Sequence, residues 1–171
     1  MTDSTTGPSV VPCEECGFPA AGGAAGCQAI FDRMLAASFE RRVPQPVHRL
    51  MVDAYSVQHP DRYCRSAKSL AAHLGGLCCF FEFGAEPAVG RALLRWLNRP
   101  RAIVKPGLPD TRGVLTLAEV IEGSDPGAFR LAIERWARAA WQAHAALHPV
   151  ARGWIAEALD APPDASPPAD A

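Results

Sequence analysis

The sequence predicts an all-α protein, a single-domain bundle of five to seven helices with a metal-binding knuckle near its N-terminus. Three observations support this fold class. Apolar residues recur at helical spacing through most of the chain, and no run alternates with the period of two that is typical of a half-buried strand. Prolines stand at the ends of the periodic segments, where helices usually stop or start.

Prolines bound the first two predicted helices. The first helix is predicted over 27–42 and ends before Pro44. The second is predicted over 47–58 and stops before Pro60, because proline disfavours helical backbone in the residue that precedes it. Pro46 suits the first turn of this second helix.

A third helix is predicted over 66–83, where large apolar residues form one stripe: Leu70, Leu74, Leu77 and Phe81. Gly75 and Gly76 interrupt it, and each costs about 1 kcal/mol relative to alanine in a helix. Either close approach by another helix or a local bend would explain this pair.

A fourth helix is predicted over 88–98, with Arg91 and Arg95 on its polar face. A proline-rich loop follows over 98–113. Thr116 and Glu119 form a capping-box pattern, which predicts a short helix.

The longest helix is predicted to begin at Asp125 and Pro126, an N-cap residue followed by proline at the first helical position. Pro149 should break or kink it, because proline lacks the backbone N–H and clashes one turn back. A last short helix is expected over 149–159.

Composition places the chain among ordinary globular proteins. It has 171 residues, 49% of them hydrophobic and 20% charged, with a net charge of −1, which argues against a general nucleic-acid binder. Between Arg41 and Arg112 there are 12 basic and 5 acidic residues. This basic middle would favour an anionic ligand, and a solvated surface with acidic tails is the alternative.

The ends of the chain differ in composition from its middle. Residues 1–12 and 160–171 are rich in proline and small residues, so we expect both to be disordered tails around a single domain over 13–159. Residues 1–12 lack the features of a signal peptide, and no stretch reaches the roughly 18 apolar residues of a membrane helix. We therefore expect a cytoplasmic protein with reduced cysteines, whose spacing indicates metal binding or catalysis.

A cysteine knuckle is the sharpest local motif. Cys13 and Cys16 are separated by two residues and followed by Gly17, a spacing that lets two thiolates bind one Zn²⁺ in a tight turn. Cys27 is a natural third ligand at the start of the first helix. The segment 13–27 therefore predicts a zinc site, with redox-active or free thiols as the alternative.

The fourth ligand has two candidates, His48 and His59. They lie eleven residues apart, about three turns, and roughly 16 Å apart along a straight helix. If the first two helices form an antiparallel hairpin, His59 returns to the level of Cys27 and His48 stays at the far end. We therefore predict His59 as the fourth ligand, and the alternative is a helix-end cation that satisfies terminal carbonyls.

Other polar residues lie in apolar surroundings. Asp53 and His73 sit on predicted helices among apolar neighbours, and His144 and His148 have the spacing that places two imidazoles on one helical face. Asp53, His73 and His148 are candidate catalytic residues that could converge with His59 in the bundle core. The alternative for each histidine is an ordinary hydrogen-bonded residue.

A longer pattern resembles a family of uncharacterised bacterial proteins with a domain of unknown function. Its hallmark is the string HRLMVDAYSVQHP over 48–60, together with the knuckle, the string SLAAHL over 69–74 and the segment 141–154. The resemblance implies one compact domain and no particular activity. It directs attention to six residues: Asp53, Tyr55, Gln58, His59, His73 and His148.

Three functions are compatible with these features. The first is a zinc-binding helical protein whose metal is structural or regulatory. The second is a metal-dependent hydrolase or transferase, in which Asp53 or His73 acts as general base. The third is an anion- or nucleic-acid-binding module that uses the basic face from Arg91 to Arg101, although the net charge makes nucleic acid the less favoured ligand. The partner, a small molecule or a protein, and the oligomeric state stay open.

Overall fold

The predicted all-α class is confirmed by the computed structural model, which describes residues 10–121 and 125–161. The described part contains eight α-helices, one 3-10 helix and a two-stranded sheet. The tails predicted over 1–9 and 162–171 lie outside the described residues.

The elements follow one another along the chain as β1 (Val10–Pro12), β2 (Pro19–Ala21), α1 (Gly23–Glu40), α2 (Gln45–Gln58), α3 (Pro60–Tyr63), α4 (Ala67–Phe83), α5 (Pro87–Asn98), α6 (Ala118–Ile121), α7 (Pro126–Ala143), η1 (Ala145–Leu147) and α8 (His148–Asp160). Two of the α-helices, α3 and α6, are single turns. The short helix predicted after Thr116 is α6. The six longer helices match those predicted from periodicity and prolines, with ends that move by a few residues.

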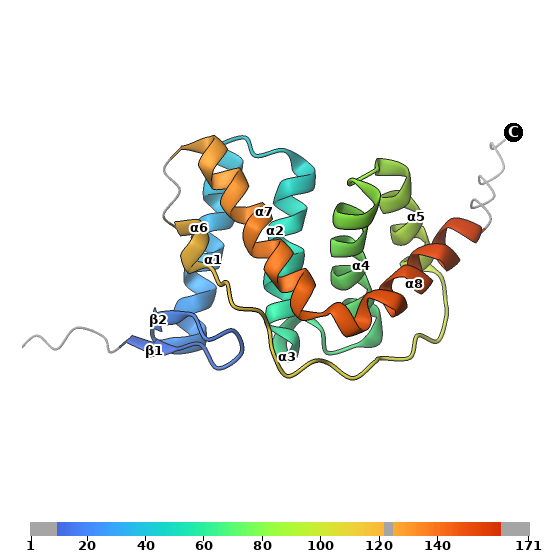
Figure 1. The fold of residues 1–171 in the computed structure, drawn as a ribbon, viewed down its shortest axis with the longest axis horizontal. Coiled ribbons are helices and arrows are strands. Elements are labelled where there is room, and N and C mark those ends of the chain that lie inside the picture. The colour runs from blue at the N-terminus through green and yellow to red at the C-terminus, as the bar shows by residue number, and fades with distance from the viewer. Residues whose placement is uncertain (1–9, 122–124, 162–171) are drawn as a thin grey trace, which may run out of the picture.

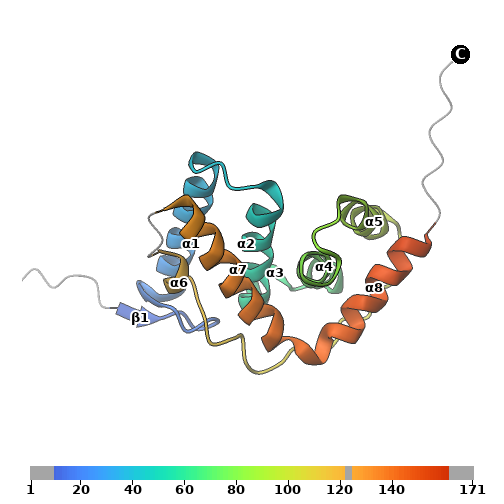
Figure 2. The same cartoon turned by 45° about the horizontal axis from the view of Figure 1, so that its top comes forward.

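Helix α2 lies at the centre of the molecule (Figure 1). It packs against α4 on one side and α7 on the other, while α8 packs against α4 and α5. Figure 2 shows the same order after rotation, with α1 and the sheet at one end and α5 and α8 at the other. Nine of the 14 residues of α2 are buried, so its side chains can reach sites on several neighbouring helices.

Helices α1 and α2 run antiparallel, as their side-chain contacts show. Ser38 Oγ lies 2.7 Å from His48 Nδ1 at one end. The rings of Phe31 and Tyr55 stack at 3.7 Å in the middle. The knuckle therefore lies at the opposite end of this pair from His48, as the hairpin argument predicted.

The N-terminal boundary of the domain differs from the expectation. Val10–Pro12, which we assigned to a tail, pair antiparallel with Pro19–Ala21. The knuckle turn reverses the chain and brings the two segments together. Strands of three residues are too short to show an alternating pattern, which is why the sequence did not predict them.

Caps and prolines act mostly where expected. Asp125 Oδ2 accepts a hydrogen bond from Ala128 N–H at 2.9 Å and starts α7, and Pro149 stands at the first turn of α8. The reciprocal capping box, however, lies at Ser66 and Ser69 at the start of α4. This is a different place from the predicted pair at 116–119.

The linker between α5 and α6 is held by a buried glutamine. Gln58 Nε2 donates to the carbonyl oxygens of Arg112 and Leu115, both at 2.8 Å. Its Oε1 accepts from Trp136 Nε1 at 2.8 Å. The segment 99–117 therefore runs along the edge of the molecule, anchored to α2 and α7 (Figure 1). None of the described helices has the length and apolar character needed to cross a bilayer.

His144 is fully buried where α7 ends. Its Nδ1 lies 2.8 Å from the Ala140 carbonyl oxygen, and its Nε2 has no hydrogen-bond partner among the residues described. Burial lowers the pKa of His144 below its ordinary value of 6.5, against the opposing effect of the hydrogen bond to the Ala140 carbonyl oxygen. The side chain is therefore neutral at pH 7.

This burial predicts an acid-sensitive fold. The pKa of His144 is lower in the folded protein than in the unfolded chain, so protonation favours the unfolded chain. The stability that depends on a neutral His144 is therefore fully present above pH 6.5 and is lost as the pH falls below that value. Between pH 7.5 and 5.5 the loss of unfolding free energy reaches at most about 1.4 kcal/mol. Urea denaturation at both pH values should show that His144→Gln loses less unfolding free energy than the unsubstituted protein. Equal losses in the two proteins would show that His144 is not the acid-sensitive group.

Candidate metal centre

The knuckle is a tight turn between β1 and β2. The Cys13 carbonyl oxygen accepts the Gly17 N–H at 2.8 Å, and the Cys13 N–H donates to the Phe18 carbonyl oxygen at 2.8 Å. Gly17 has φ +76°, a left-handed conformation that favours glycine. The turn places the thiols of Cys13 and Cys16 in the interior, where both are buried.

A close contact between the sheet and α1 positions the third cysteine. A Cβ atom on Gly26 would lie 1.9 Å from the Ala21 carbonyl oxygen, so only glycine lets the strand approach this helix. Cys27 follows directly and is fully buried. Its Sγ lies 3.8 Å from that of Cys16, too far for a disulfide bond, whose sulfurs are about 2.05 Å apart.

His59 joins these cysteines from the end of α2. Its Nδ1 lies 2.7 Å from the Tyr55 carbonyl oxygen, so Nδ1 carries the proton and donates it, which leaves the Nε2 lone pair free. That Nε2 lies 3.6 Å from Cys13 Sγ and 3.4 Å from Cys27 Sγ. Metal-binding histidines are usually oriented in this way, by a hydrogen bond from the ring nitrogen that does not bind the metal.

Four buried side chains thus bring their ligand atoms together, namely those of Cys13, Cys16, Cys27 and His59. All of these atoms lie within 4.8 Å of one another, so the group could hold one metal ion. The four residues are the ones that the sequence singled out as candidate ligands. The other candidate, His48, contacts Ser38 and Phe39 at the far end of α1.

The cluster favours a thiolate at Cys27. The hydrogen bond from Cys16 is the main cause that lowers the pKa of Cys27 to about 4, with further contributions from His59 and Tyr55 against the opposing effect of burial. The same hydrogen bond raises the pKa of Cys16, and burial adds to that rise. Thiolates are the form of cysteine that binds metals.

Aromatic and amide side chains surround the cluster. The Tyr55 ring stacks on His59 at 3.8 Å, and its hydroxyl donates to Cys27 Sγ at 3.7 Å. Burial raises the pKa of Tyr55, so the hydroxyl keeps its proton. The Tyr63 hydroxyl donates to Gln28 Oε1, which also lies 3.4 Å from the Tyr55 hydroxyl oxygen and can share the Tyr55 proton with Cys27. Gln28 and Tyr63 were not predicted as site residues, because neither belongs to a motif and only the fold brings them here.

The knuckle is also tied to α3. The Glu15 carboxylate accepts a hydrogen bond from the Asp61 N–H at 2.9 Å, and Arg62 donates to Gln28 at 3.0 Å. These contacts connect the sheet, α1 and the turn after His59. The candidate metal centre is therefore the junction of the N-terminal part of the molecule.

The candidate catalytic residues lie at two separate places. His73 Nδ1 is 2.9 Å from Asp53 Oδ1, on facing helices. His148 instead stacks on the Trp141 ring at 3.6 Å, and its Nε2 lies 3.0 Å from the Trp141 carbonyl oxygen. The structure thus pairs Asp53 with His73, whereas His59 belongs to the cysteine cluster.

Asp53 is held in the interior by two partners. Its carboxylate oxygens each accept from Arg49 Nε at 2.9 Å, and its side chain is 1% exposed. A Cβ atom on Gly76 would lie 2.0 Å from Asp53 Oδ2. Gly75 similarly faces Leu93 of α5, so the glycine pair in α4 marks close approach by its neighbours.

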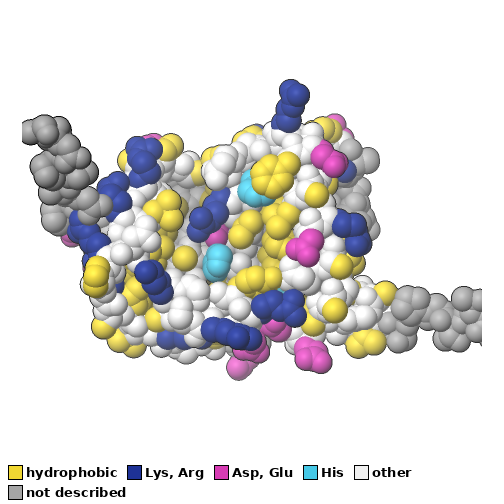
Figure 3. Space-filling model, turned by 180° about the vertical axis from the view of Figure 1, so that it is seen from behind, with side chains coloured by type: hydrophobic (Ala, Val, Ile, Leu, Met, Phe, Trp, Pro, Cys, Tyr) yellow, Lys and Arg dark blue, Asp and Glu magenta, His cyan; other side chains and the backbone are white. Residues whose placement is uncertain are grey.

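The arginines between 91 and 101 do not form one uniform surface. Arg101 lies over the Trp96 ring at 4.5 Å and pairs with Glu157 at 3.2 Å, while Arg91 lines a cavity beside α4. Figure 3 shows basic side chains scattered over one face of the molecule among apolar and neutral ones.

Comparison with known proteins identifies a family but no activity. The model of a family described as "Family of unknown function (DUF5946)" matches residues 11–145. This range includes all four residues of the cluster as well as Asp53 and His73, and it stops before His148. No curated protein and no solved structure matches the chain.

Proposed function

The chain belongs to DUF5946, a family of unknown function, and we propose from its site that it is a zinc-binding helical protein whose metal is structural. The observation that carries this proposal is the buried set of three thiols and one imidazole. A Cys₃His set is one of the common ligand sets of structural zinc, and soft sulfur ligands favour Zn²⁺ over the hard cations Mg²⁺ and Ca²⁺.

Three of the six distances between ligand atoms match a tetrahedral zinc site, and all six lie within 4.8 Å. With Zn–S bonds of about 2.3 Å and Zn–N bonds of about 2.05 Å, a tetrahedral site has S–S edges of about 3.8 Å and S–N edges of about 3.6 Å. The distance between the Cys16 and Cys27 sulfurs is 3.8 Å, and the distances from His59 Nε2 to Cys13 and Cys27 are 3.6 and 3.4 Å.

Four protein ligands complete a tetrahedral shell, which supports a structural role. A catalytic zinc usually keeps one position open for water or substrate. Here the ligands come from the β1–β2 turn, from α1 and from the end of α2. The metal would join three segments, including two three-residue strands that are too short to be stable alone. Reduced thiols suit a reducing compartment such as the cytoplasm.

Removing the metal tests the structural role. Treatment with a chelator at neutral pH should raise amide hydrogen exchange in residues 10–35, because these segments lose the bond that joins them to α2. Exchange in α4, α5 and α8 should change little, and added zinc should restore the original pattern. Unchanged exchange in 10–35 after the metal is lost would contradict a structural role.

The contact between Asp53 and His73 favours one second candidate, a hydrolase or transferase. A carboxylate that accepts from one imidazole nitrogen orients the other nitrogen as a base or as a metal ligand. This candidate requires a metal outside the cysteine cluster. It predicts that a Cys13→Ser plus Cys16→Ser variant keeps its metal and that His73→Ala loses it. A double cysteine variant without metal, beside a His73→Ala variant that keeps its metal, would exclude this candidate.

A further inference from the structure

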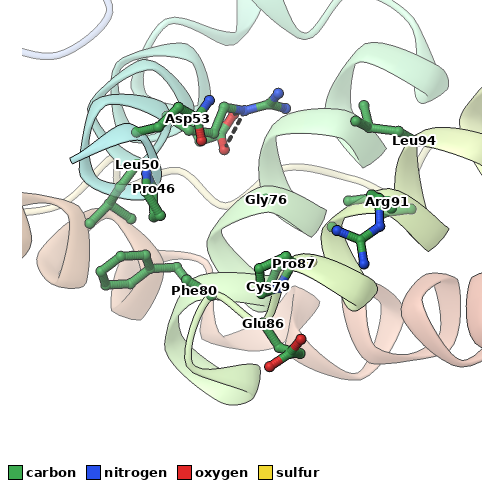
Figure 4. A pocket seen from close by; sticks show the side chains of 15 residues that line it. Pro46, Leu50, Asp53, Gly76, Cys79, Phe80, Glu86, Pro87, Arg91 and Leu94 are labelled. Carbon is green, nitrogen blue, oxygen red and sulfur yellow. Dashed lines mark hydrogen bonds and ion pairs between the residues drawn. The ribbon is translucent and has the colours of Figure 1, made fainter.

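A cavity of about 290 Å³ lies between α2, α4 and the start of α5 (Figure 4). It is separate from the cysteine cluster, since none of the four cluster residues lines it. Its volume suits a small organic molecule. The charges and apolar side chains around it indicate which class of molecule fits.

Of the two acidic groups of the cavity, Asp53 is already paired and Glu86 lies at the exposed rim. Asp53 accepts from Arg49 with both oxygens and lies beside His73. Glu86 is the N-cap of α5, where its Oε1 accepts from the Ala88 N–H at 3.4 Å. Figure 4 shows the Glu86 carboxylate turned away from the end of the cavity where Asp53 lies. A cationic ligand would therefore find no free carboxylate at the end of the cavity where Asp53 lies.

The basic groups, by contrast, have donors to spare. Arg91 lines the cavity, and within the described part of the chain its guanidinium has no ion pair or hydrogen bond. Arg49 uses Nε for Asp53 and Nη2 for the Ala72 carbonyl oxygen, which leaves Nη1 for a ligand. A guanidinium with a free edge matches the planar geometry of a carboxylate.

The remaining wall of the cavity is apolar. Leu50 and Phe80 line it from α2 and α4, and Leu94 lines it from α5. Leu94 is 50% exposed, so a ligand in the cavity can reach it. Figure 4 shows Arg91 and Leu94 on the same helix at the cavity, so one ligand could contact both.

We propose that this cavity binds a small organic carboxylate with an apolar body. Arg91 holds the carboxylate, Arg49 supplies a second donor, and Leu50, Phe80 and Leu94 contact the apolar body. Of the basic face from Arg91 to Arg101 that was considered for anion binding, this site uses Arg91 alone. It does not involve the candidate metal centre.

Benzoate is a suitable probe, with benzamide as its neutral counterpart. Titration of the zinc-loaded full chain, followed by amide chemical shifts, should show saturable benzoate binding that changes residues 84–94. Arg91→Gln should weaken benzoate binding about tenfold, because one charge-assisted contact is lost. Arg95→Gln is the matched control, since this exposed arginine lies one turn further along α5 and does not line the cavity.

Several results would overturn the proposal. Equal binding of benzoate and benzamide would show that charge is not recognised, and equal losses in Arg91→Gln and Arg95→Gln would show that the arginine is not specific. Inorganic phosphate binding as tightly as benzoate would show that the apolar wall is not used. Absence of saturable benzoate binding would also count against the site.

Discussion

Cys27→Ser is expected to lose the bound metal and several kcal/mol of unfolding free energy. Cys27 lies at the centre of the cluster, with Sγ 3.8 Å from Cys16 Sγ and 3.4 Å from His59 Nε2. Structural zinc in small peptides binds with about 10–16 kcal/mol, and that binding contributes directly to folding. Metal content and urea denaturation of the purified variant measure the two effects.

Cys64→Ser provides the matched control for this variant. Cys64 is equally buried, but its thiol donates to the Ser56 carbonyl oxygen at 3.4 Å and lies outside the cluster. The hydroxyl of serine can donate to the same carbonyl, so we expect normal metal content and a loss of about 1 kcal/mol. Equal loss of metal in both variants would show that any buried cysteine matters to the same extent.

Gly76→Ala should have the second-largest effect, a loss of about 2–3 kcal/mol of unfolding free energy. The added Cβ would lie 2.0 Å from Asp53 Oδ2 and 2.7 Å from its Cγ, so the buried carboxylate would have to move away from Arg49 and His73. Overpacking of this kind typically costs 1–3 kcal/mol, and disturbing a buried ion pair adds to it. Thermal and urea denaturation measure the loss.

A double-mutant cycle isolates the cause of that loss. In an Asp53→Ala background the clashing atoms are absent, so Gly76→Ala should cost less than about 1 kcal/mol, which gives a coupling of about 2 kcal/mol. Gly153→Ala in α8 is the control, because its Cβ would meet nothing within 4 Å. That control should gain about 0.5–1 kcal/mol of unfolding free energy from helix propensity. If the effects of Gly76→Ala and Asp53→Ala simply add, the steric explanation is contradicted.

Much of the candidate metal centre was predictable because its parts follow local rules. The Cys-x-x-Cys-Gly spacing indicates a ligand pair without any knowledge of the fold. The choice of His59 over His48 needed only the rise of an α-helix and a short connection between two helices. The observed contacts of Ser38 with His48 and of Cys27 with His59 follow that hairpin.

The rest of the fold and site depends on tertiary contacts that one sequence does not specify. Asp53 and His73 were both recognised as unusual, but they lie 20 residues apart on separate helices and nothing in the pattern pairs them. For Gly76 the sequence left close approach and a local bend as alternatives, and only the fold shows that Asp53 lies against it. Gln28 is an ordinary polar residue of α1 whose role depends on two tyrosines from later in the chain.

We propose that one structural zinc ion is bound by Cys13, Cys16, Cys27 and His59. Elemental analysis of the purified, untagged protein beside a Cys13→Ser plus Cys16→Ser variant tests it most directly. We predict about one zinc per chain in the first sample and almost none in the second, together with a lower melting temperature. Zinc retained in the variant, or no metal in either sample, would contradict the claim.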